Sequence, residues 1–207
     1  MKQVEIITIY PRGFASNTYV ITADGKNAIV IDPALPTVAQ ALAERGLSAQ
    51  WVLLTHSHFD HIGGVPRLAL AGAKVGCAEK EKAAIGTLSE IGAQYGYPPF
   101  DLAVDRFFRD GEELELCGVK LRVMETPGHT VGSVCYLLEN ERVIFSGDTL
   151  MPQSMGRTDF PTGNVGAMRN SLRKLVSLKG DYRVLSGHGE ETTLNEERQT
   201  NYFLAEL

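Results

Sequence analysis

A run of six residues concentrates four side chains that can bind metal ions: His56, His58, Asp60 and His61 form the pattern His-x-His-x-Asp-His. In an extended segment His56 and His58 point to the same side, whereas on a helix they would diverge by roughly 200°. One ion can therefore bind both only if the run leaves a strand. Packing three imidazoles and a carboxylate without a cation would leave buried polar groups unpaired, at a cost of several kcal/mol. The pattern predicts a metal site rather than a cluster of structural histidines.

Three further residues of the same kinds stand at equivalent places along the chain. His129, Asp148 and His188 each follow a short apolar, strand-like run and lie beside a glycine. A lone histidine in a loop is more often an ordinary surface residue than a ligand. Strand ends that meet at one edge of a sheet commonly form a binding cleft, however. We therefore expect these three side chains to join the first four around one site.

The elements that must position these residues come in two similar halves. In the first half we expect strands at 4–10, 17–22, 28–31, 51–55 and 73–77. We expect one helix at 36–45, a second that follows the run at 56–64 and ends at Leu70, and a third at 79–90. In the second half we expect strands at 112–116, 119–126, 133–138, 143–145 and 182–185, a long polar loop at 151–164, a helix at 165–178 and a closing helix from near Thr193. Because the order of strands followed by a helix occurs in both halves of the chain, we expect a four-layer αββα sandwich of the α+β or α/β class. No repeat or linker divides the chain, so we expect a single domain over residues 1–207.

The composition excludes several classes of protein. The chain of 207 residues is mildly acidic, with a net charge of −5 and 22% charged residues, which argues against a general nucleic-acid binder. No apolar run approaches the ~20 residues that cross a bilayer, so neither a membrane span nor a signal peptide is expected. Cys77, Cys117 and Cys135 lie far apart without a Cys-x-x-Cys spacing. They are interpreted as buried thiols of a cytoplasmic protein.

Four motifs in a fixed order identify a family resemblance. The run His56–His61 is followed by Pro-Gly-His-Thr at 127–130, Ser-Gly-Asp-Thr at 146–149 and Ser-Gly-His-Gly at 186–189. This set resembles the metallo-β-lactamase fold superfamily over nearly the whole chain, and the αββα sandwich of that family is the fold it implies. The resemblance implies one zinc ion on His56, His58 and His129 and a second on Asp60, His61 and His188, with Asp148 bridging the two. An all-nitrogen and oxygen site suits zinc, but also iron or manganese.

Within the superfamily the chain is most similar to the glyoxalase II-like, or hydroxyacylglutathione hydrolase-like, enzymes. The runs at 156–161 and 192–198 resemble the small single-domain members of that group. A carboxylate at Asp148 differs from the lactam-hydrolysing branches, and His58 differs from the flavodiiron branch. The resemblance implies a small-molecule thioester substrate, of which S-lactoylglutathione is the type. Full-length glyoxalase II has a further C-terminal helical domain that binds glutathione, so thioester cleavage is implied more strongly than glutathione as the thiol.

The expected mechanism is hydrolysis by water. Two metals ~3.5–4 Å apart can share a water and lower its pKa toward ~7. The resulting hydroxide would attack the thioester carbonyl, while one ion polarises the carbonyl oxygen and the other stabilises the leaving thiolate. Asp60 is expected to orient the hydroxide and to take its proton.

Other candidate residues have both a functional and a purely structural interpretation. Arg157 is expected to bind a substrate carboxylate, or else to form a structural salt bridge with Asp159. Asp32, which ends the strand at 28–31, is expected either to hold a ligand imidazole or to be a turn residue. The aromatic residues of the loop near the site are candidates for lining the cleft or for simple packing: Tyr95, Tyr97 and Phe100.

Three other functions share the resemblance or the metal site. A persulfide dioxygenase of the same fold would use one iron bound by His56, His129 and Asp148, and it would consume oxygen. A nuclease of this fold is disfavoured by the acidic charge. A metal-binding module without catalysis would need a degenerate second site, whereas every expected ligand is present.

Overall fold

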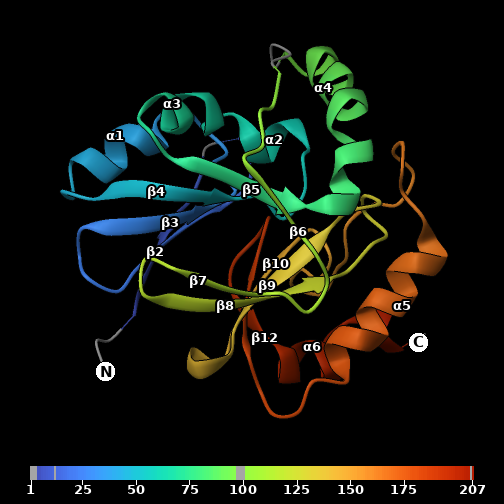
Figure 1. Ribbon diagram of the computed structural model, residues 1–207. Helices are drawn as coiled ribbons and strands as arrows, with labels where there is room; N and C mark the ends of the chain where they lie inside the picture. Colours follow the sequence, from blue (N-terminus) through green and yellow to red (C-terminus); the bar gives the residue numbers. More distant parts are fainter. Residues whose placement is uncertain (1–3, 12, 97–100, 206) are drawn as a thin grey trace.

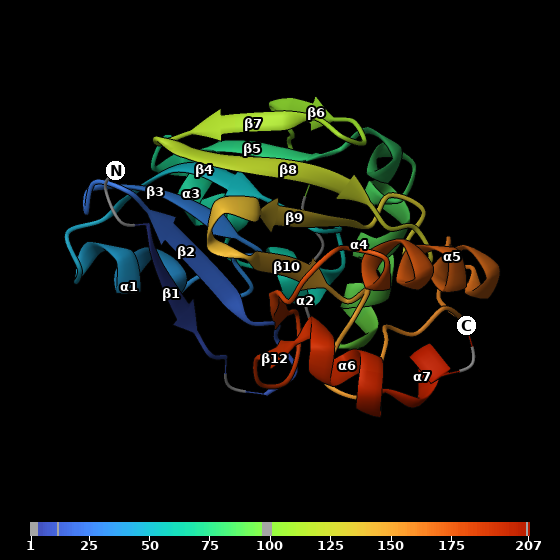
Figure 2. The same cartoon turned by 90° about the horizontal axis from the view of Figure 1, so that it is seen from below.

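Two six-stranded β-sheets pack face to face and form the centre of the molecule (Figures 1 and 2). The computed structural model describes residues 4–11, 13–96, 101–205 and 207. The first sheet contains, in spatial order, β1 (Glu5–Ile9), β2 (Thr18–Thr22), β3 (Asn27–Ile31), β4 (Ser48–Leu53), β5 (Lys74–Ala78) and β6 (Arg106–Phe108). The second contains β12 (Thr192–Thr193), β11 (Arg183–Ser186), β10 (Val143–Gly147), β9 (Val134–Leu138), β8 (Val119–Glu125) and β7 (Glu113–Leu116). Both sheets are mixed, with parallel pairs at β3–β4, β4–β5, β5–β6 and β10–β11.

Helices cover the outer faces of both sheets. The helical elements are α1 (Val38–Ala43), α2 (Phe59–Ile62), α3 (Val65–Leu70), the 3-10 helix η1 (Glu79–Ala83), α4 (Ile85–Gln94), the 3-10 helix η2 (Glu139–Glu141), α5 (Val165–Val176), α6 (Leu194–Thr200) and α7 (Tyr202–Ala205). In Figure 1, α1 and α3 lie on the outer side of the first sheet, while α5 and α6 lie on that of the second. The expected four-layer αββα sandwich is confirmed. None of the described helices is long and apolar enough to cross a membrane.

Three apolar clusters explain why these layers hold together. Successive side chains of a strand point to opposite faces, and β3 shows this directly. Ile29 and Ile31 pack between the two sheets, whereas Val30 packs outward against α1 and α3. A third cluster joins α5 to the outer face of the second sheet through Met168 and Leu172, among others. Each fully buried side chain of this size contributes about 1.5–3 kcal/mol, so the sheets and their covering helices are stabilised as one stack.

Local signals in the sequence set the ends of several elements. Gly46 adopts φ +68° after α1, and the next residue, Leu47, donates its N–H to Leu42 O, which closes the helix. Asn164 caps α5 by accepting the N–H of Ala167, and Thr193 caps α6 by accepting that of Glu196. These caps confirm the predicted starts of both helices.

Other boundaries differ from the prediction. Strand β4 covers Ser48–Leu53 rather than 51–55, so Thr55 belongs to the loop that follows. The expected helix at 79–90 is divided into the 3-10 helix η1 and α4. The short strands β6 and β12 were not predicted. Their three and two residues are too few to show an alternating pattern.

The loops that follow β4, β8, β10 and β11 all meet at one end of the sandwich. Val134 N–H donates to Thr55 O at 2.9 Å, which joins the β4 loop to the second sheet. Gly187 N–H donates to Gly147 O at 2.8 Å, which joins the loop after β11 to the end of β10. The predicted site residues lie in these loops and in α2, which follows the β4 loop, so the topology brings both halves of the chain to one place.

Candidate metal centre

The His-x-His-x-Asp-His run passes from the end of β4 into α2. His58 is the N-cap residue of α2 and has an extended backbone, with φ −64° and ψ 146°. The imidazole rings of His56 and His58 lie on the same side, with centroids 4.7 Å apart. Asp60 and His61 follow in the first turn of α2. The change from extended chain to helix therefore lets all four side chains face one region, as the spacing predicts.

A first cluster of possible ligands contains His56, His58 and His129, all buried. One nitrogen from each ring lies within 4.8 Å of the other two, close enough for a single ion. His58 Nδ1 lies 2.7 Å from His129 Nε2. The first two residues come from the first sheet and the third comes from the loop between β8 and β9.

A second cluster contains Asp60, His61 and His188. His188 Nε2 lies 3.2 Å from Asp60 Oδ2, and His61 Nε2 lies 4.0 Å from the same oxygen. His61 is fully buried, whereas Asp60 and His188 are partly exposed. This cluster therefore offers an ion one face open to solvent.

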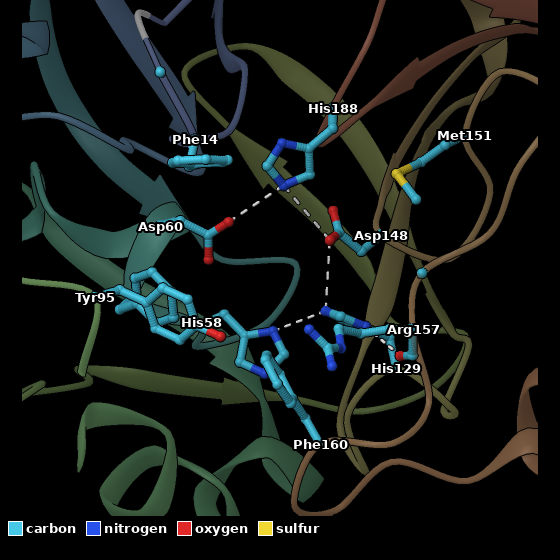
Figure 3. Close-up of a pocket in the computed structure, with 13 residues that line it drawn as sticks. Phe14, His58, Asp60, Tyr95, His129, Asp148, Met151, Arg157, Phe160 and His188 are labelled. Atoms are coloured by element: carbon cyan, nitrogen blue, oxygen red, sulfur yellow. Dashed lines mark hydrogen bonds and ion pairs between the residues drawn. The ribbon is translucent and has the colours of Figure 1, made fainter. Parts of the chain in front are cut away.

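Asp148 lies between the two clusters (Figure 3). Its carboxylate is 3.5 Å from His129 Nε2 in the first cluster, and 3.4 and 3.6 Å from His61 Nε2 and His188 Nε2 in the second. A carboxylate has two oxygens that can each bind a cation. Asp148 thus lies within reach of both clusters, which is the place expected for a bridging ligand.

Four buried atoms of the site lack hydrogen-bond partners among the described residues: His56 Nε2, His58 Nε2, His61 Nε2 and Asp148 Oδ1. Leaving buried polar atoms unpaired costs about 1–3 kcal/mol each. A cation bound by His56 Nε2, His61 Nε2 and Asp148 Oδ1 would remove that cost at three of these atoms, whereas His58 faces His129 through its other nitrogen, Nδ1. The donor set therefore fits divalent metal ions.

Three of the buried histidines are oriented by a contact on their other nitrogen. His61 Nδ1 lies 2.9 Å from Asp32 Oδ2, His56 Nδ1 lies 3.0 Å from Thr55 Oγ1, and His129 Nδ1 lies 2.7 Å from Arg157 O. Such contacts fix the ring and its tautomer. They leave Nε2 of each of these rings facing the centre of the site.

Asp32 also lies close enough to His56 and His61 to form a third possible cluster. Its oxygens already accept the N–H and hydroxyl of Thr55 at 2.8 and 2.6 Å, besides contacting His61. The geometry therefore favours the first of the two expected roles, that of holding a ligand imidazole. The turn is still present, since Asp32 has φ +48°.

The electrostatics of the site separate neutral from charged groups. Burial lowers the pKa of His58 to about 3 and, with the nearby imidazoles, lowers the pKa of His56 well below its ordinary value. Burial opposes ionisation of Asp148, but the imidazoles of His61 and His129 outweigh it and hold its pKa well below its ordinary value. Burial likewise opposes the charge on His61, but the surrounding carboxylates raise its pKa well above 6.5. Neutral imidazoles and ionised carboxylates are the forms that bind metals, so an ion at the second cluster would take the place of the second proton that these carboxylates hold on His61.

A cavity of about 510 Å³ opens onto the site. Its walls are largely aromatic and apolar: Phe14, Phe59, Tyr95, Met151 and Phe160. Figure 3 shows Phe14, Tyr95, Met151 and Phe160 around the histidines and aspartates. Tyr95 stacks on Phe59 with ring centroids 5.2 Å apart, so this predicted lining residue does reach the cleft. Tyr97 and Phe100 lie outside the described residues.

Arg157 lines the same cavity but is already paired. Its guanidinium binds both oxygens of Asp159, at 2.7 and 2.8 Å, and its central carbon lies 3.7 Å from the ring centroid of Phe160. The salt bridge named as the alternative is thus present. A role of Arg157 in binding substrate remains a prediction.

Sequence reasoning missed two kinds of supporting residue. One is a backbone group: the carbonyl of Arg157 orients His129. Every residue has a carbonyl, so the pattern of side chains in the sequence cannot indicate which one makes this contact. The others are buried polar side chains far away in the chain, among them Glu81 and Asn17. Asn17 donates to Gly189 O at 2.9 Å beside His188. The residues next to Glu81 and Asn17 in the sequence do not indicate that these two side chains are buried.

The fold and the site together define a metal-dependent hydrolase of the metallo-β-lactamase superfamily, to which this chain belongs. A family model for that superfamily matches residues 11–188. The chain is 36% identical over 208 residues to hydroxyacylglutathione hydrolase GloC of Haemophilus influenzae, an alignment that covers 97% of each protein.

Solved structures agree with this assignment. The B3 metallo-β-lactamase BLEG-1 superposes with a TM-score of 0.87 at 32% identity, covering 98% of this chain and 99% of that one. TTHA1623, solved in a di-iron-bound form, superposes with a TM-score of 0.84 at 33% identity, covering 97% and 100%. The expected resemblance to the superfamily and to hydroxyacylglutathione hydrolases is confirmed.

Proposed function

We propose that this chain is a dinuclear metal-dependent hydrolase that cleaves a small-molecule thioester of the S-lactoylglutathione type, and that residues 1–207 form one hydrolase domain. The observation that carries the proposal is the pair of three-ligand clusters on either side of Asp148, at the floor of an open cavity. The similarity to hydroxyacylglutathione hydrolase GloC supports the choice of a thioester.

The seven candidate ligands divide into two sets under this proposal. His56, His58 and His129 would hold one ion, Asp60, His61 and His188 would hold the second, and Asp148 would contact both. Zinc is the proposed metal, and iron and manganese accept the same nitrogen and oxygen donors. The di-iron form of TTHA1623 supports iron as the alternative.

The metals would supply Lewis-acid chemistry, lowering the pKa of water and stabilising negative charge on the substrate. Asp60 is the proposed catalytic residue of the chain. Burial opposes its ionisation, but His61 and His188 outweigh burial and lower its pKa, so the carboxylate is ionised at neutral pH. It faces the cavity and can orient a water molecule or accept a proton from it (Figure 3).

The cysteines do not compete with water as the nucleophile. Burial raises the pKa of Cys77 to about 12 and that of Cys135 to about 11, and it also raises the pKa of Cys117. A thiol reacts as its thiolate. These thiols are protonated at neutral pH, so attack by water is the route that the chain supports.

Arg157 is the proposed contact for a carboxylate of the substrate. Asp159 already binds the edge of the guanidinium formed by Nε and Nη2. A substrate carboxylate would therefore have to displace Asp159 or bind beside it. Replacing Arg157 with Gln is expected to raise KM for an acidic thioester more than it lowers kcat, because the interaction would form in the ground state as well.

The test combines elemental analysis with turnover. The purified protein is expected to contain two divalent ions per chain and to hydrolyse S-lactoylglutathione, with activity lost on chelation and restored by zinc. Asp148→Ala is expected to abolish turnover and lower the metal content. Undiminished turnover of Asp148→Ala with two bound ions would contradict the proposed role of Asp148.

Two other substrates test the competing functions. Oxygen consumption on glutathione persulfide, with one iron per chain and no thioester cleavage, would favour the persulfide dioxygenase. Hydrolysis of a chromogenic cephalosporin in preference to the thioester would favour a lactamase, the activity that BLEG-1 is named for.

A further inference from the structure

A fully buried carboxylate lies behind the first ligand cluster. Glu81, in the 3-10 helix η1, has no solvent-exposed surface. Its neighbour Lys80 is exposed and pairs with Glu125 on the surface. Burying an ionised carboxylate is costly unless several donors surround it. Glu81 must therefore have partners in the interior that justify its position.

Those partners are four donors from two separate loops. Glu81 Oε1 accepts the N–H and the hydroxyl of Ser57, both at 2.7 Å. Glu81 Oε2 accepts the hydroxyl of Thr130 at 2.7 Å and the N–H of Gly132 at 3.1 Å. Burial raises the pKa of Glu81, and the hydrogen bonds from Ser57 and Thr130 oppose that rise.

The two loops are the ones that carry the first cluster. Ser57 stands between His56 and His58, and Thr130 directly follows His129. The first loop belongs to one sheet and the second loop to the other. One carboxylate thus holds together the two segments whose rings approach to 2.7 Å at His58 Nδ1 and His129 Nε2.

The backbone is packed tightly against this carboxylate. A Cβ atom built on Gly132 would overlap the backbone N and Cα of Glu81 and would lie 2.6 Å from its Cβ. Any side chain at position 132 would push the His129 loop away from η1. The close approach of these two segments is therefore built into the fold.

The second cluster depends on other contacts. His61 is oriented by Asp32, and the loop of His188 is held by Asn17, which donates through its backbone to Gly187 O at 2.7 Å and through its side chain to Gly189 O at 2.9 Å. The four hydrogen bonds of Glu81 reach neither of these segments. A change at Glu81 should therefore reach one cluster before the other.

We propose that Glu81 is a positioning residue that sets the separation of His58 from His129 and thereby controls ion binding by the first cluster. This inference rests on the ligand assignment of the proposed function, but not on its substrate. Glu81 acts on the ligands through Ser57, Thr130 and Gly132, to which its carboxylate is hydrogen-bonded.

Glu81→Gln changes the side chain very little in size but disturbs its hydrogen bonds, because the donors are divided between the two carboxylate oxygens. Each carboxylate oxygen receives one backbone N–H and one hydroxyl. The hydroxyls of Ser57 and Thr130 can rotate to accept from the new amide group, but a backbone N–H cannot reverse its role. Whichever way the amide points, one backbone N–H faces another donor and that loop must move.

Glu79→Gln is the matched control. Glu79 lies on the same 3-10 helix, is about half exposed, and pairs with Arg109 at the surface. The same chemical change there removes a negative charge without touching either ligand loop. Any difference between the two variants then reports the interior contacts of Glu81.

The experiment measures zinc affinity by competition with a chromophoric chelator in two backgrounds. His188→Ala leaves only the first cluster with three ligands, and His58→Ala leaves only the second. We expect Glu81→Gln to weaken zinc binding about 10–100-fold in the His188→Ala background, the range typical of residues that orient ligands. We expect a change of less than about threefold in the His58→Ala background, and Glu79→Gln to have no effect in either.

Equal weakening in both backgrounds would show a merely structural role and would overturn the proposal, as would unchanged affinity in the His188→Ala background. Thr130→Val removes only one of the four donors and provides a milder variant should Glu81→Gln not fold. It is expected to weaken zinc binding in the His188→Ala background alone. No thioester is used, so failure of the proposed activity and failure of this inference are separate results.

Discussion

Replacing Asp32 with Asn tests whether the geometry of the site controls metal binding through the tautomer of one histidine. The Asp32 side chain is buried, with an exposed fraction of 2% for the residue, and its carboxylate is hydrogen-bonded to Thr55 and His61. An asparagine side chain has the same shape, so the fold should accept it. The difference is that one acceptor oxygen becomes a donor.

The amide introduced by Asp32→Asn can point in only one favourable direction. Its oxygen must accept the backbone N–H of Thr55, which cannot reverse, so the amide nitrogen takes the place of Asp32 Oδ2. There it faces the Thr55 hydroxyl, which can rotate to accept, and His61 Nδ1, 2.9 Å away. His61 can accept only by moving its proton to Nε2, the nitrogen that faces the second cluster.

The expected magnitude follows from the contact that is lost. A hydrogen bond to a charged group contributes about 1.5–3 kcal/mol. At about 1.36 kcal/mol for each factor of ten, this weakens ion binding at the second cluster roughly 10–100-fold. The first cluster is linked to Asp32 through the Thr55 hydroxyl, which also contacts His56 Nδ1. Because that oxygen can accept two hydrogen bonds, it can still accept from His56, and the first cluster should change much less.

Zinc titration with a competing chelator measures the affinities, and ¹⁵N–¹H correlation spectra of the imidazoles report which nitrogen of His61 carries the proton. Asp105→Asn is the control, because the Asp105 carboxylate accepts a backbone N–H, from Val75 at 2.7 Å, and lies away from the histidines of the site. The reasoning is refuted if Asp32→Asn keeps the proton of His61 on Nδ1 and binds both ions with wild-type affinity.

Three further predictions concern stability and surface charge. Gly132→Ala should lower the free energy of unfolding by about 1–3 kcal/mol through overlap with Glu81, while Gly86→Ala, where no described atom lies within 4 Å of the new Cβ, should cause no loss in a thermal melt. When the free metal ion is held at about 100 times its Kd, removing the metal by chelation should lower Tm by roughly 5–10 °C for each ion released. An unchanged Tm would argue against bound metal. The hydrogen bond from Arg157 lowers the pKa of Asp159 to about 2. In Arg157→Gln this pKa should return toward about 3.9, which ¹³C NMR of the carboxylate measures. Because the pKa is lower in the folded state, the stabilisation by this pair is present above pH ~4 and is lost as the pH falls toward about 2.

The sequence was sufficient for the fold because each layer leaves a local pattern. Short apolar runs separated by turn residues marked ten of the strands, and the capping-box spacing of Thr193 and Glu196 marked the start of the closing helix. The strand ends also predicted that His129, Asp148 and His188 would meet the His56–His61 run. The structure brings all seven together.

Other features could not be read from local patterns. Glu81 lies in the run Glu-Lys-Glu-Lys, which is typical of a solvated helix, yet its partners are 24 to 51 residues away. Strand β6 is recognised only through its pairing with β5, since three residues show no periodicity. The carbonyl of Arg157 contacts His129 whatever side chain stands there. Such contacts depend on tertiary structure, so a single sequence does not report them.

The division of the ligands between the two sheets has a consequence for the lifetime of the folded protein. In each three-residue cluster of the proposed assignment, two ligands follow β4 of the first sheet, and the third comes from a loop of the second sheet. Neither sheet can retain an ion with its own residues alone, so any opening of the sandwich at this end must release the metals. Separation of the sheets would therefore release the ions, and the free energy of ion binding adds to the stability of the sandwich. Scarcity of metal would therefore make this protein easier to unfold and to proteolyse, besides removing its proposed activity.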